Sequence, residues 1–215
     1  HREETVSVEV ATGTVFVEII RRAREKAVDV ILVGAHGEQF INKLLFGRTA
    51  ERIVRRGDRP ILVVKRRMRG PYRTVLVPTD FSEQSGEALE LAMRVAPGAK
   101  CLVLHAYQGI EQQLWRSDFP RRDILRYRRE AAKKSREQLK HFIHQRGLDS
   151  TSFVRLVRYG RAPQVISSVA RRLHPDLVAV GSAGRTGLPY VLLGSVAEHV
   201  LRGLPCDVLV ARSGS

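Results

Sequence analysis

Short apolar runs alternate with amphipathic stretches through residues 72–213. Five runs are apolar almost throughout, at residues 74–79, 101–107, 153–158, 176–181 and 207–211. Runs of this length are typical of parallel strands that are buried on both faces. Between them, Ser82 can cap one helix, a longer helix fits residues 121–145, and another begins near Ser195. The alternation predicts an α/β fold, an open parallel five-stranded sheet with helices on both faces.

The N-terminal part of the chain repeats the second half of this pattern. A shift of 147 positions aligns the two parts without a gap. The coincident pairs include Gly13 with Gly160, Asp29 with Asp176, Gly34 with Gly181, Gly37 with Gly184, Gly47 with Gly194, and Arg55 with Arg202. Matching at a fixed offset over this length predicts a tandem duplication.

The duplication divides the chain into two expected domains, with a break at Gly70–Pro71. Residues 72–213 are expected to form a complete second domain. Residues 1–66 are expected to form the C-terminal half of a first domain, with strands at residues 6–10, 29–34 and 60–64. On this interpretation the sequence begins inside the first domain, and that domain's first two strands lie before His1.

Composition narrows the class of protein. Hydrophobic residues make up 43% and charged residues 27% of the 215 residues, which is typical of a soluble globular chain. No apolar run approaches the roughly 20 residues that span a bilayer. Cys101 and Cys206 both lie in apolar, strand-like runs, which indicates buried thiols in a reducing compartment. The expected location is cytoplasmic.

The formal net charge of +15 favours phosphate-bearing partners or anionic surfaces without choosing between them. Arginine and lysine cluster in residues 65–70 and 126–136. The second cluster lies in the expected long helix, with glutamates interspersed and without aromatic interleaving. These features favour a solvated helical face over a nucleic-acid surface.

Glycines give residues 180–200 the most distinctive pattern in the chain. Gly181 ends an apolar run, and Ser195 and Val196 follow Gly194 at the start of a helix. A helix N-terminus presents N–H groups and a partial positive charge, and glycine lets a phosphate approach the backbone. Arg185 adds a nearby positive charge. The residues alone leave a phosphate loop and a tight structural turn as alternatives, since the spacing is neither Walker A nor the dinucleotide fingerprint.

The spacing Gly181-x2-Gly184-x9-Gly194-Ser195 resembles that of the universal stress protein family. Nucleotide-binding members of that family carry Gly-x2-Gly-x9-Gly-Ser/Thr, and residues 77–83 and 192–202 resemble the family as well. The resemblance covers nearly all of residues 74–211 and part of residues 5–66. It implies an adenine nucleotide alpha-hydrolase-like sheet and ATP as the ligand, with Mg²⁺ accompanying the phosphates.

The resemblance also assigns roles to single residues. It implies that Pro78, Thr79 and Asp80 contact the adenosine, that Ala106 lines the adenine pocket, and that Gly181, Gly184, Gly194, Ser195 and Val196 hold the phosphates. Arg185 is added to the phosphate residues because of its charge and its place in the loop. Two alternatives remain: Asp80 as a helix cap only, and His105 as a packed residue rather than a base. Ala183 and Pro189–Tyr190 depart from the usual family text.

The first copy departs further, because Arg48 replaces the small hydroxyl residue and Thr49 follows it. We expect an incomplete or degenerate site there.

The leading hypothesis is a nucleotide-binding regulatory protein of the stress response. No general base is positioned to activate water and no metal-ligand cluster is visible, so no catalytic residue is assigned and any ATP hydrolysis is expected to be slow. One alternative is a ligand-independent scaffold, a pseudo-dimer in which residues 60–64 and 207–211 pair within the chain, as family members pair through their last strands; a homodimer stays open. The other is a basic protein that binds nucleic acid or a membrane surface.

Overall fold

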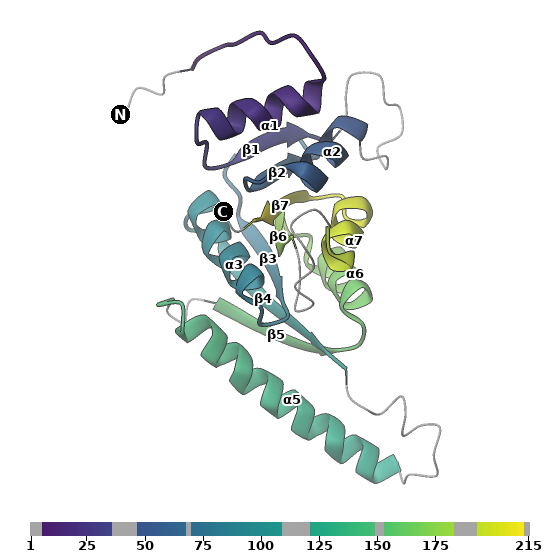
Figure 1. Ribbon diagram of the computed structural model, residues 1–215. Coiled ribbons are helices and arrows are strands. Elements are labelled where there is room, and N and C mark those ends of the chain that lie inside the picture. Colours follow the sequence, from purple (N-terminus) through teal and green to yellow (C-terminus); the bar gives the residue numbers. More distant parts are fainter. Residues whose placement is uncertain are drawn as a thin grey trace.

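Seven strands form one sheet in the computed structural model (Figure 1). The structure describes residues 6–35, 47–67, 70–108, 121–148, 153–182 and 193–212. The strand order is β1-β2-β7-β6-β3-β4-β5. The strands are β1 (Ile31–Gly34), β2 (Ile61–Val64), β3 (Thr74–Thr79), β4 (Lys100–Tyr107), β5 (Phe153–Tyr159), β6 (Leu177–Gly181) and β7 (Asp207–Ala211). The five strands of the second repeat pair in parallel, which confirms the predicted α/β sheet.

Helices cover the sheet unevenly. They are α1 (Val15–Glu25), α2 (Arg48–Arg56), α3 (Glu83–Val95), α5 (Arg121–His144), α6 (Ala162–Leu173) and α7 (Ser195–Gly203). α1, α2, α6 and α7 pack on one face and share one apolar core with the sheet. α3 and α5 pack on the other face, over the strands of the second repeat (Figure 1). No helix in the described ranges is long and apolar enough to cross a membrane.

Local chemistry accounts for the helix boundaries of the second repeat. Ser82 caps α3, and its Oγ accepts a hydrogen bond from the Ser85 N–H at 3.3 Å. α6 carries Pro163 in its first turn, where the missing N–H costs nothing. α5 buries Leu139 and Phe142 against the sheet, while most of its other side chains face solvent. These helices match the predicted ones closely.

The two repeats have the same backbone conformation at positions 147 residues apart. Gly13 and Gly160 have φ angles of 136° and 135°. Ala27 and His174, neither of which is glycine, both adopt a left-handed conformation, with φ of 48° and 46°. Positive φ is uncommon for such residues, so its recurrence at the same offset shows that the sequence repeat is also a structural one.

The backbone hydrogen bonds made near the glycine before α2 also recur at the glycine before α7. The Ala35 N–H donates to Val64 O at 2.8 Å, and the Gly47 N–H donates to Ala35 O at 2.9 Å. In the second repeat, the Ser182 N–H donates to Ala211 O at 3.0 Å, and the Gly194 N–H donates to Ser182 O at 2.8 Å. α2 and α7 therefore leave the sheet in the same way.

An antiparallel pairing of β2 with β7 joins the two repeats, with Leu62 opposite Leu209. Side chains cross this junction in both directions. Lys65 Nζ donates to two carbonyls at the end of α7, Leu201 O at 2.5 Å and Leu204 O at 2.7 Å, and Arg212 donates to Val54 O near the end of α2. Because Lys65 and Arg212 are themselves 147 positions apart, the junction has an approximate twofold symmetry.

The predicted strand at residues 6–10 is wrong. Val6, Val8 and Val10 are 84%, 88% and 91% exposed, and the segment pairs with no strand. Its counterpart in the second repeat is β5, an edge strand that pairs with β4. The described residues from 6 to 67 include no counterpart of β4, so the alternating apolar pattern has no neighbouring strand to pair with. The other two predicted strands of the first repeat form as β1 and β2.

Candidate functional site

The predicted site residues gather at the carboxyl ends of three neighbouring strands. β3 pairs with β4 on one side and with β6 on the other. The chain runs from β3 through α3 to β4, whereas β6 continues through α7 to β7 in the opposite direction across the sheet (Figure 1). A topological switch point therefore lies between β3 and β6. Ligands of open α/β sheets bind at such points.

Asp80 holds the turn that follows β3. Its Oδ1 accepts hydrogen bonds from the Ser82 N–H at 3.1 Å and from the Ser82 Oγ–H at 2.5 Å. An aspartate that bonds to the residue two positions ahead forms a compact turn. Ser82 in turn caps α3, so Asp80 positions the capping residue. This geometry supports the alternative in which the role of Asp80 is to stabilise the start of the helix.

Phe81 adopts a left-handed conformation within this turn, with φ of 67°. Its N–H donates to Thr79 Oγ1 at 2.9 Å. Its ring stacks on His105 with 4.1 Å between centroids and meets Phe142 edge-on at 5.7 Å. A bulky residue at positive φ is strained, and these contacts hold the strained turn in place.

Pro78 and Thr79 are buried beneath the turn. The Thr79 hydroxyl lies 2.8 Å from the Ser85 hydroxyl, and Thr79 O lies 2.9 Å from His105 Nδ1. These polar atoms connect β3 to α3 and to β4. His105 is thus a packed, hydrogen-bonded residue, in agreement with the structural interpretation made from the sequence.

Ala106 lies at the end of β4, one strand away from Asp80. It is half-buried and packs against the core on the α6 and α7 face of the sheet. This position is compatible with a wall of an adenine pocket.

Gly181 ends β6 directly against the start of α3. A Cβ at this position would lie 2.9 Å from both the carbonyl carbon and the carbonyl oxygen of Gln84. Contacts under 3.0 Å with backbone require something to move, so the close approach of α3 requires glycine here. Packing is therefore one reason for Gly181, whether or not a phosphate also approaches it.

Gly194 immediately precedes α7, with φ of −62° and ψ of 151°. Its carbonyl accepts the Glu198 N–H at 2.9 Å, and no side chain caps the helix. Ser195 is exposed and Val196 is half-buried in the first turn. The positive end of α7 thus lies beyond β6 with its first N–H groups uncapped by side chains. The other two predicted phosphate residues, Gly184 and Arg185, lie outside the described residues.

The chemistry of the assembled site suits binding more than catalysis. It combines N–H donors at α7, the Asp80 carboxylate, and the small wall residue Ala106. In the described ranges, no group of three or more His, Cys, Asp or Glu residues is placed to hold a metal ion. Burial raises the pKa of the Cys101 thiol to about 12 and that of Cys206 to about 11, so neither is a reactive thiolate at neutral pH.

The first repeat has only part of this arrangement. Gly47 precedes α2 with φ of −62° and ψ of 141°, almost the conformation of Gly194. Arg48 and Thr49 begin the helix where Ser195 and Val196 stand in the second repeat. β1 ends in Gly34 and pairs only with β2, so no described strand takes the place of β3. Gly37 lies outside the described residues.

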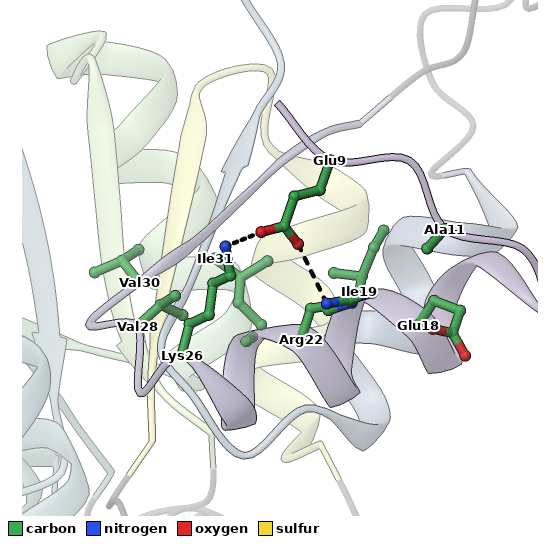
Figure 2. A pocket seen from close by; sticks show the side chains of 10 residues that line it. Glu9, Ala11, Glu18, Ile19, Arg22, Lys26, Val28, Val30 and Ile31 are labelled. Carbon is green, nitrogen blue, oxygen red and sulfur yellow. Dashed lines mark hydrogen bonds and ion pairs between the residues drawn. The ribbon is translucent and has the colours of Figure 1, made fainter. Parts of the chain in front are cut away.

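A cavity of about 340 Å³ lies away from the predicted site, between α1, β1 and the segment before α1 (Figure 2). Its lining is Glu9, Ala11, Glu18, Ile19, Arg22, Ala23, Lys26, Val28, Val30 and Ile31. Glu9 crosses it to form ion pairs with Arg22, at 3.4 Å, and with Lys26. In the second repeat the equivalent elements, β5, α6 and β6, enclose β3 and β4. The cavity thus occupies the place of two strands and contains none of the predicted site residues.

Comparisons with known proteins agree with the fold and the repeat. The model of the universal stress protein family matches residues 1–65 and again residues 71–212. The chain belongs to the universal stress protein family. Among its relatives, universal stress protein Rv1996 of Mycobacterium tuberculosis is 28% identical over 221 residues, covering 98% of this chain and 67% of Rv1996. A universal stress protein of Thermus aquaticus is 29% identical over 143 residues, covering 66% of this chain and 99% of its own length.

Solved structures support the same fold. The functionally unknown protein PA1789 from Pseudomonas aeruginosa superposes with a TM-score of 0.68 at 20% sequence identity, covering 94% of this chain and 69% of PA1789. This universal stress protein therefore spans about two thirds of the length of Rv1996 and of PA1789.

Three features of the site were not anticipated from the sequence. The turn after β3 has a signal in the Asp80-x-Ser82 spacing, because an aspartate can bond to the residue two positions ahead. The left-handed Phe81 has no signal in the sequence, because its conformation is imposed by His105 and Phe142 from distant elements. The contact of Gly181 with Gln84 likewise depends on how α3 docks.

Proposed function

We propose that the second repeat of this universal stress protein binds an adenine nucleotide, with ATP as the ligand. The observation that carries the proposal is the meeting of Asp80, Ala106 and the α7 N-terminus at one switch point of the sheet. The glycine spacing from Gly181 to Ser195, which resembles that of nucleotide-binding family members, supports the same assignment. The protein then acts as a cytoplasmic stress-response regulator through binding.

The start of α7 suits the phosphates. A helix N-terminus carries roughly half a positive elementary charge, and its first N–H groups can donate hydrogen bonds to an anion. Ser195 adds a hydroxyl at this end, and Gly194 presents no side chain to obstruct the approach. Gly184 and Arg185 would act on the same phosphates. Mg²⁺ would arrive bound to phosphate oxygens, since it keeps several waters and needs few protein ligands.

The ends of β3 and β4 suit the nucleoside. Asp80 lies at the end of β3, and a carboxylate is a good acceptor for ribose hydroxyls. Ala106 lies on the adjacent strand, where a small apolar residue accommodates a planar base. Buried Pro78 and Thr79 support the turn from below. His105 is engaged with Thr79 O and Phe81, so the site lacks a described base aimed at water, and we infer binding or slow hydrolysis.

Isothermal titration calorimetry with ATP, ADP and AMP tests the proposal. We expect the wild-type protein to bind ATP and Gly194→Val to lose measurable binding, because a branched side chain would stand in front of the α7 donors. Gly194 has a φ of −62°, which any residue adopts, but a Cβ at the equivalent Gly47 would lie 3.1 Å from Ala35 O, so thermal melts first establish that this variant and Gly47→Val both fold. Losing one or two charge-assisted hydrogen bonds of about 1.5–3 kcal/mol each lowers affinity by roughly tenfold to more than a thousandfold.

Gly47→Val is the matched control, because Gly47 has the same φ and the same backbone bonds in the first repeat. It should leave ATP affinity unchanged. Equal losses in both variants would show that the effect is not local to the second repeat. Absence of adenylate binding to the wild type at millimolar concentration would overturn the proposal.

A second candidate is a ligand-independent scaffold. The pairing of β2 with β7 and the reciprocal contacts of Lys65 and Arg212 favour it, because they give one chain the symmetry of a dimer. Native mass spectrometry separates the two. A purified chain that carries no nucleotide, and whose melting temperature ATP does not change, supports the scaffold; co-purified adenylate supports the nucleotide-dependent regulator.

A further inference from the structure

The exposed side of α5 carries a regular line of cations. α5 contains nine arginines and lysines against three acidic residues. Six of the nine form what we call the cationic row: Arg122, Arg126, Arg129, Lys133, Arg136 and Lys140. All six are exposed.

The spacing of the cationic row makes it straight. Its members follow one another at intervals of four, three, four, three and four residues. At 3.6 residues per turn, all six side chains leave the helix within an arc of about 80°, over a length of about 27 Å. Such a row presents one positive charge for roughly each turn of helix, in a single line rather than scattered around the surface.

The row is not neutralised by neighbouring acids. Within the described part of the chain, the ion pair found for the row joins Arg126 to Asp123, at 3.6 Å. Glu130 and Glu137 stand four residues after Arg126 and Lys133, which is the spacing of an i,i+4 pair. Among the described residues, however, the ion pairs found within 4.0 Å include neither glutamate, so Asp123 is the acid that meets the row.

The opposite side of α5 is already used by the fold. Ile124, Leu139, Phe142 and Ile143 are buried against the sheet. α5 lies beside β5, the edge strand of the sheet (Figure 1), and the six side chains of the cationic row are exposed. A helix that inserts into a membrane interface buries its apolar side in lipid, and in α5 that side is unavailable.

We infer that the cationic row of α5 binds the phosphate backbone of duplex DNA without sequence preference. Arginine suits this partner because its planar guanidinium donates two parallel hydrogen bonds to a phosphate. We expect a base-paired duplex rather than a single strand, because the row itself contains no aromatic residue on which an unpaired base could stack. The two tyrosines nearby are already covered by arginines: Arg126 lies over the Tyr127 ring at 5.6 Å, and Arg128 lies over the Tyr159 ring at 4.0 Å.

The positions of the cations on α5 favour nucleic-acid binding more than the linear sequence does. In the linear sequence, the basic residues form a run mixed with glutamates, which is typical of a solvated face. On the helix, six of the nine cations share one side, with Glu130 and Glu137 along one edge of it. The inference does not rest on the proposed ATP site: α5 meets the turn after β3 through buried Phe142, which contacts Phe81, whereas the cationic row lies on exposed positions of the helix.

Fluorescence anisotropy with a labelled duplex of mixed sequence tests the inference. The wild-type chain should bind with a dissociation constant in the range of about 10⁻⁴ to 10⁻⁶ M at physiological salt. The logarithm of the affinity should fall with the logarithm of salt concentration, with a slope of up to about −5 for six neutralised phosphates. The double variant Arg129→Gln/Lys133→Gln should reduce the steepness of this slope by about 2 and weaken binding by at least roughly tenfold.

The double variant Arg171→Gln/Arg172→Gln is the control, because it removes the same charge from exposed positions at the end of α6. It should leave most of the binding intact, and circular dichroism should show both variants folded. Equal effects of the two variants would attribute binding to net charge alone and overturn the inference. Tighter binding, at the same salt concentration, to a single-stranded oligonucleotide or to phosphatidylserine vesicles would overturn the choice of partner, as would a wild-type chain that binds no duplex at low salt.

Discussion

The two repeats are built alike from Gly13 and Gly160 onward and differ before those positions. Gly47 and Gly194 share their backbone angles and hydrogen bonds, and Gly13 and Gly160 share their φ. The second repeat adds β3, α3, β4 and α5, which have no described counterparts in the first. The start of the short helix is thus common to both repeats, whereas the switch point beside it exists only where β3 is present. A helix N-terminus alone does not make a site.

The same difference governs how the sheet is covered. Leu32 in β1 is 65% exposed, whereas its counterpart Ala179 in β6 is 0% exposed beneath α3. On the face covered by α1 and α2, by contrast, Ile53 and Val54 are fully buried. Their counterparts Val200 and Leu201 are buried as well. One face of the sheet is therefore a continuous core across both repeats, and the other face is a core in the second repeat only.

Truncation of a leucine on each side of this boundary should give the largest contrast. Leu89 on α3 is fully buried, so Leu89→Ala should lower the free energy of unfolding by about 2–5 kcal/mol. Leu32→Ala should change it by less than about 0.5 kcal/mol, because its side chain is mostly in water. Urea denaturation followed by circular dichroism measures both. Comparable losses would mean that something covers Leu32 in solution.

Glycine-to-alanine changes at the ends of β6 and β1 should give the next largest contrast. Gly181→Ala brings a methyl group to 2.9 Å from the Gln84 backbone, and such overpacking costs about 1–3 kcal/mol. Its counterpart Gly34 is exposed and lies on a strand with no helix like α3 over it, so Gly34→Ala should be near neutral. Thermal melts of the two variants provide the measurement. A neutral Gly181→Ala would show that α3 does not dock as closely as described.

Much of the second repeat follows from the sequence, because each level of pattern agrees with the next. The five apolar runs became β3 to β7, Ser82 caps α3, and the helix expected over residues 121–145 spans Arg121–His144. The internal repeat was visible because glycines at fixed offsets perform the same backbone task twice. The glycine pattern placed the α7 start correctly at Gly194 and Ser195.

What the sequence did not predict depends on contacts between distant elements. Residues 6–10 alternate like a strand, but a strand needs a partner, and the described chain offers none there. The strained turn at Phe81 depends on rings from β4 and α5. The requirement for glycine at position 181 depends on the path of α3. Local propensity carries no information on any of these.

The reciprocal contacts of Lys65 and Arg212 should differ in their pH dependence, which sharpens the comparison at the junction. Burial lowers the pKa of Lys65 from 10.5 to about 8 in the folded chain. Between these values the unfolded chain binds more protons than the folded chain, so Lys65 makes the free energy of unfolding rise with pH. Below about pH 8, both states are protonated and the cost of burying the charge is present in full.

Lys65→Arg removes this titration and keeps a donor for the α7 carbonyls. From pH 8 to pH 10, wild-type stability should rise relative to that of Lys65→Arg, by no more than about 1.4 kcal/mol per pH unit. The difference between the two proteins is the measured quantity, because the raised pKa values of Tyr72 and Cys101 carry no contribution from Lys65. The Cys206 thiol does interact with Lys65, but burial raises its pKa to about 11, above this range. A difference that stays flat over this range would show that the Lys65 ammonium keeps an ordinary pKa.

The smallest predicted effect is also the most direct test of symmetry. Arg55 pairs with Glu198 at 2.9 Å, and Arg202 pairs with Glu51 at 2.6 Å, each pair linking α2 to α7. Each glutamate also meets the arginine of its own helix, at 3.2 Å and 3.3 Å. These side chains are 28–50% exposed, so each interhelical pair should contribute only about 0.2–1 kcal/mol.

Double-mutant cycles with alanine should give the same coupling energy for Arg55–Glu198 as for Arg202–Glu51, and both should weaken in high salt. Equality is expected because the two pairs are related by the offset of 147 residues and lie in equivalent surroundings, even though the rest of each repeat differs. A clear coupling in one pair with none in the other would show that the uneven covering of the sheet reaches the α2–α7 contact. In that case the junction would resemble a dimer in its connections but not in its energetics.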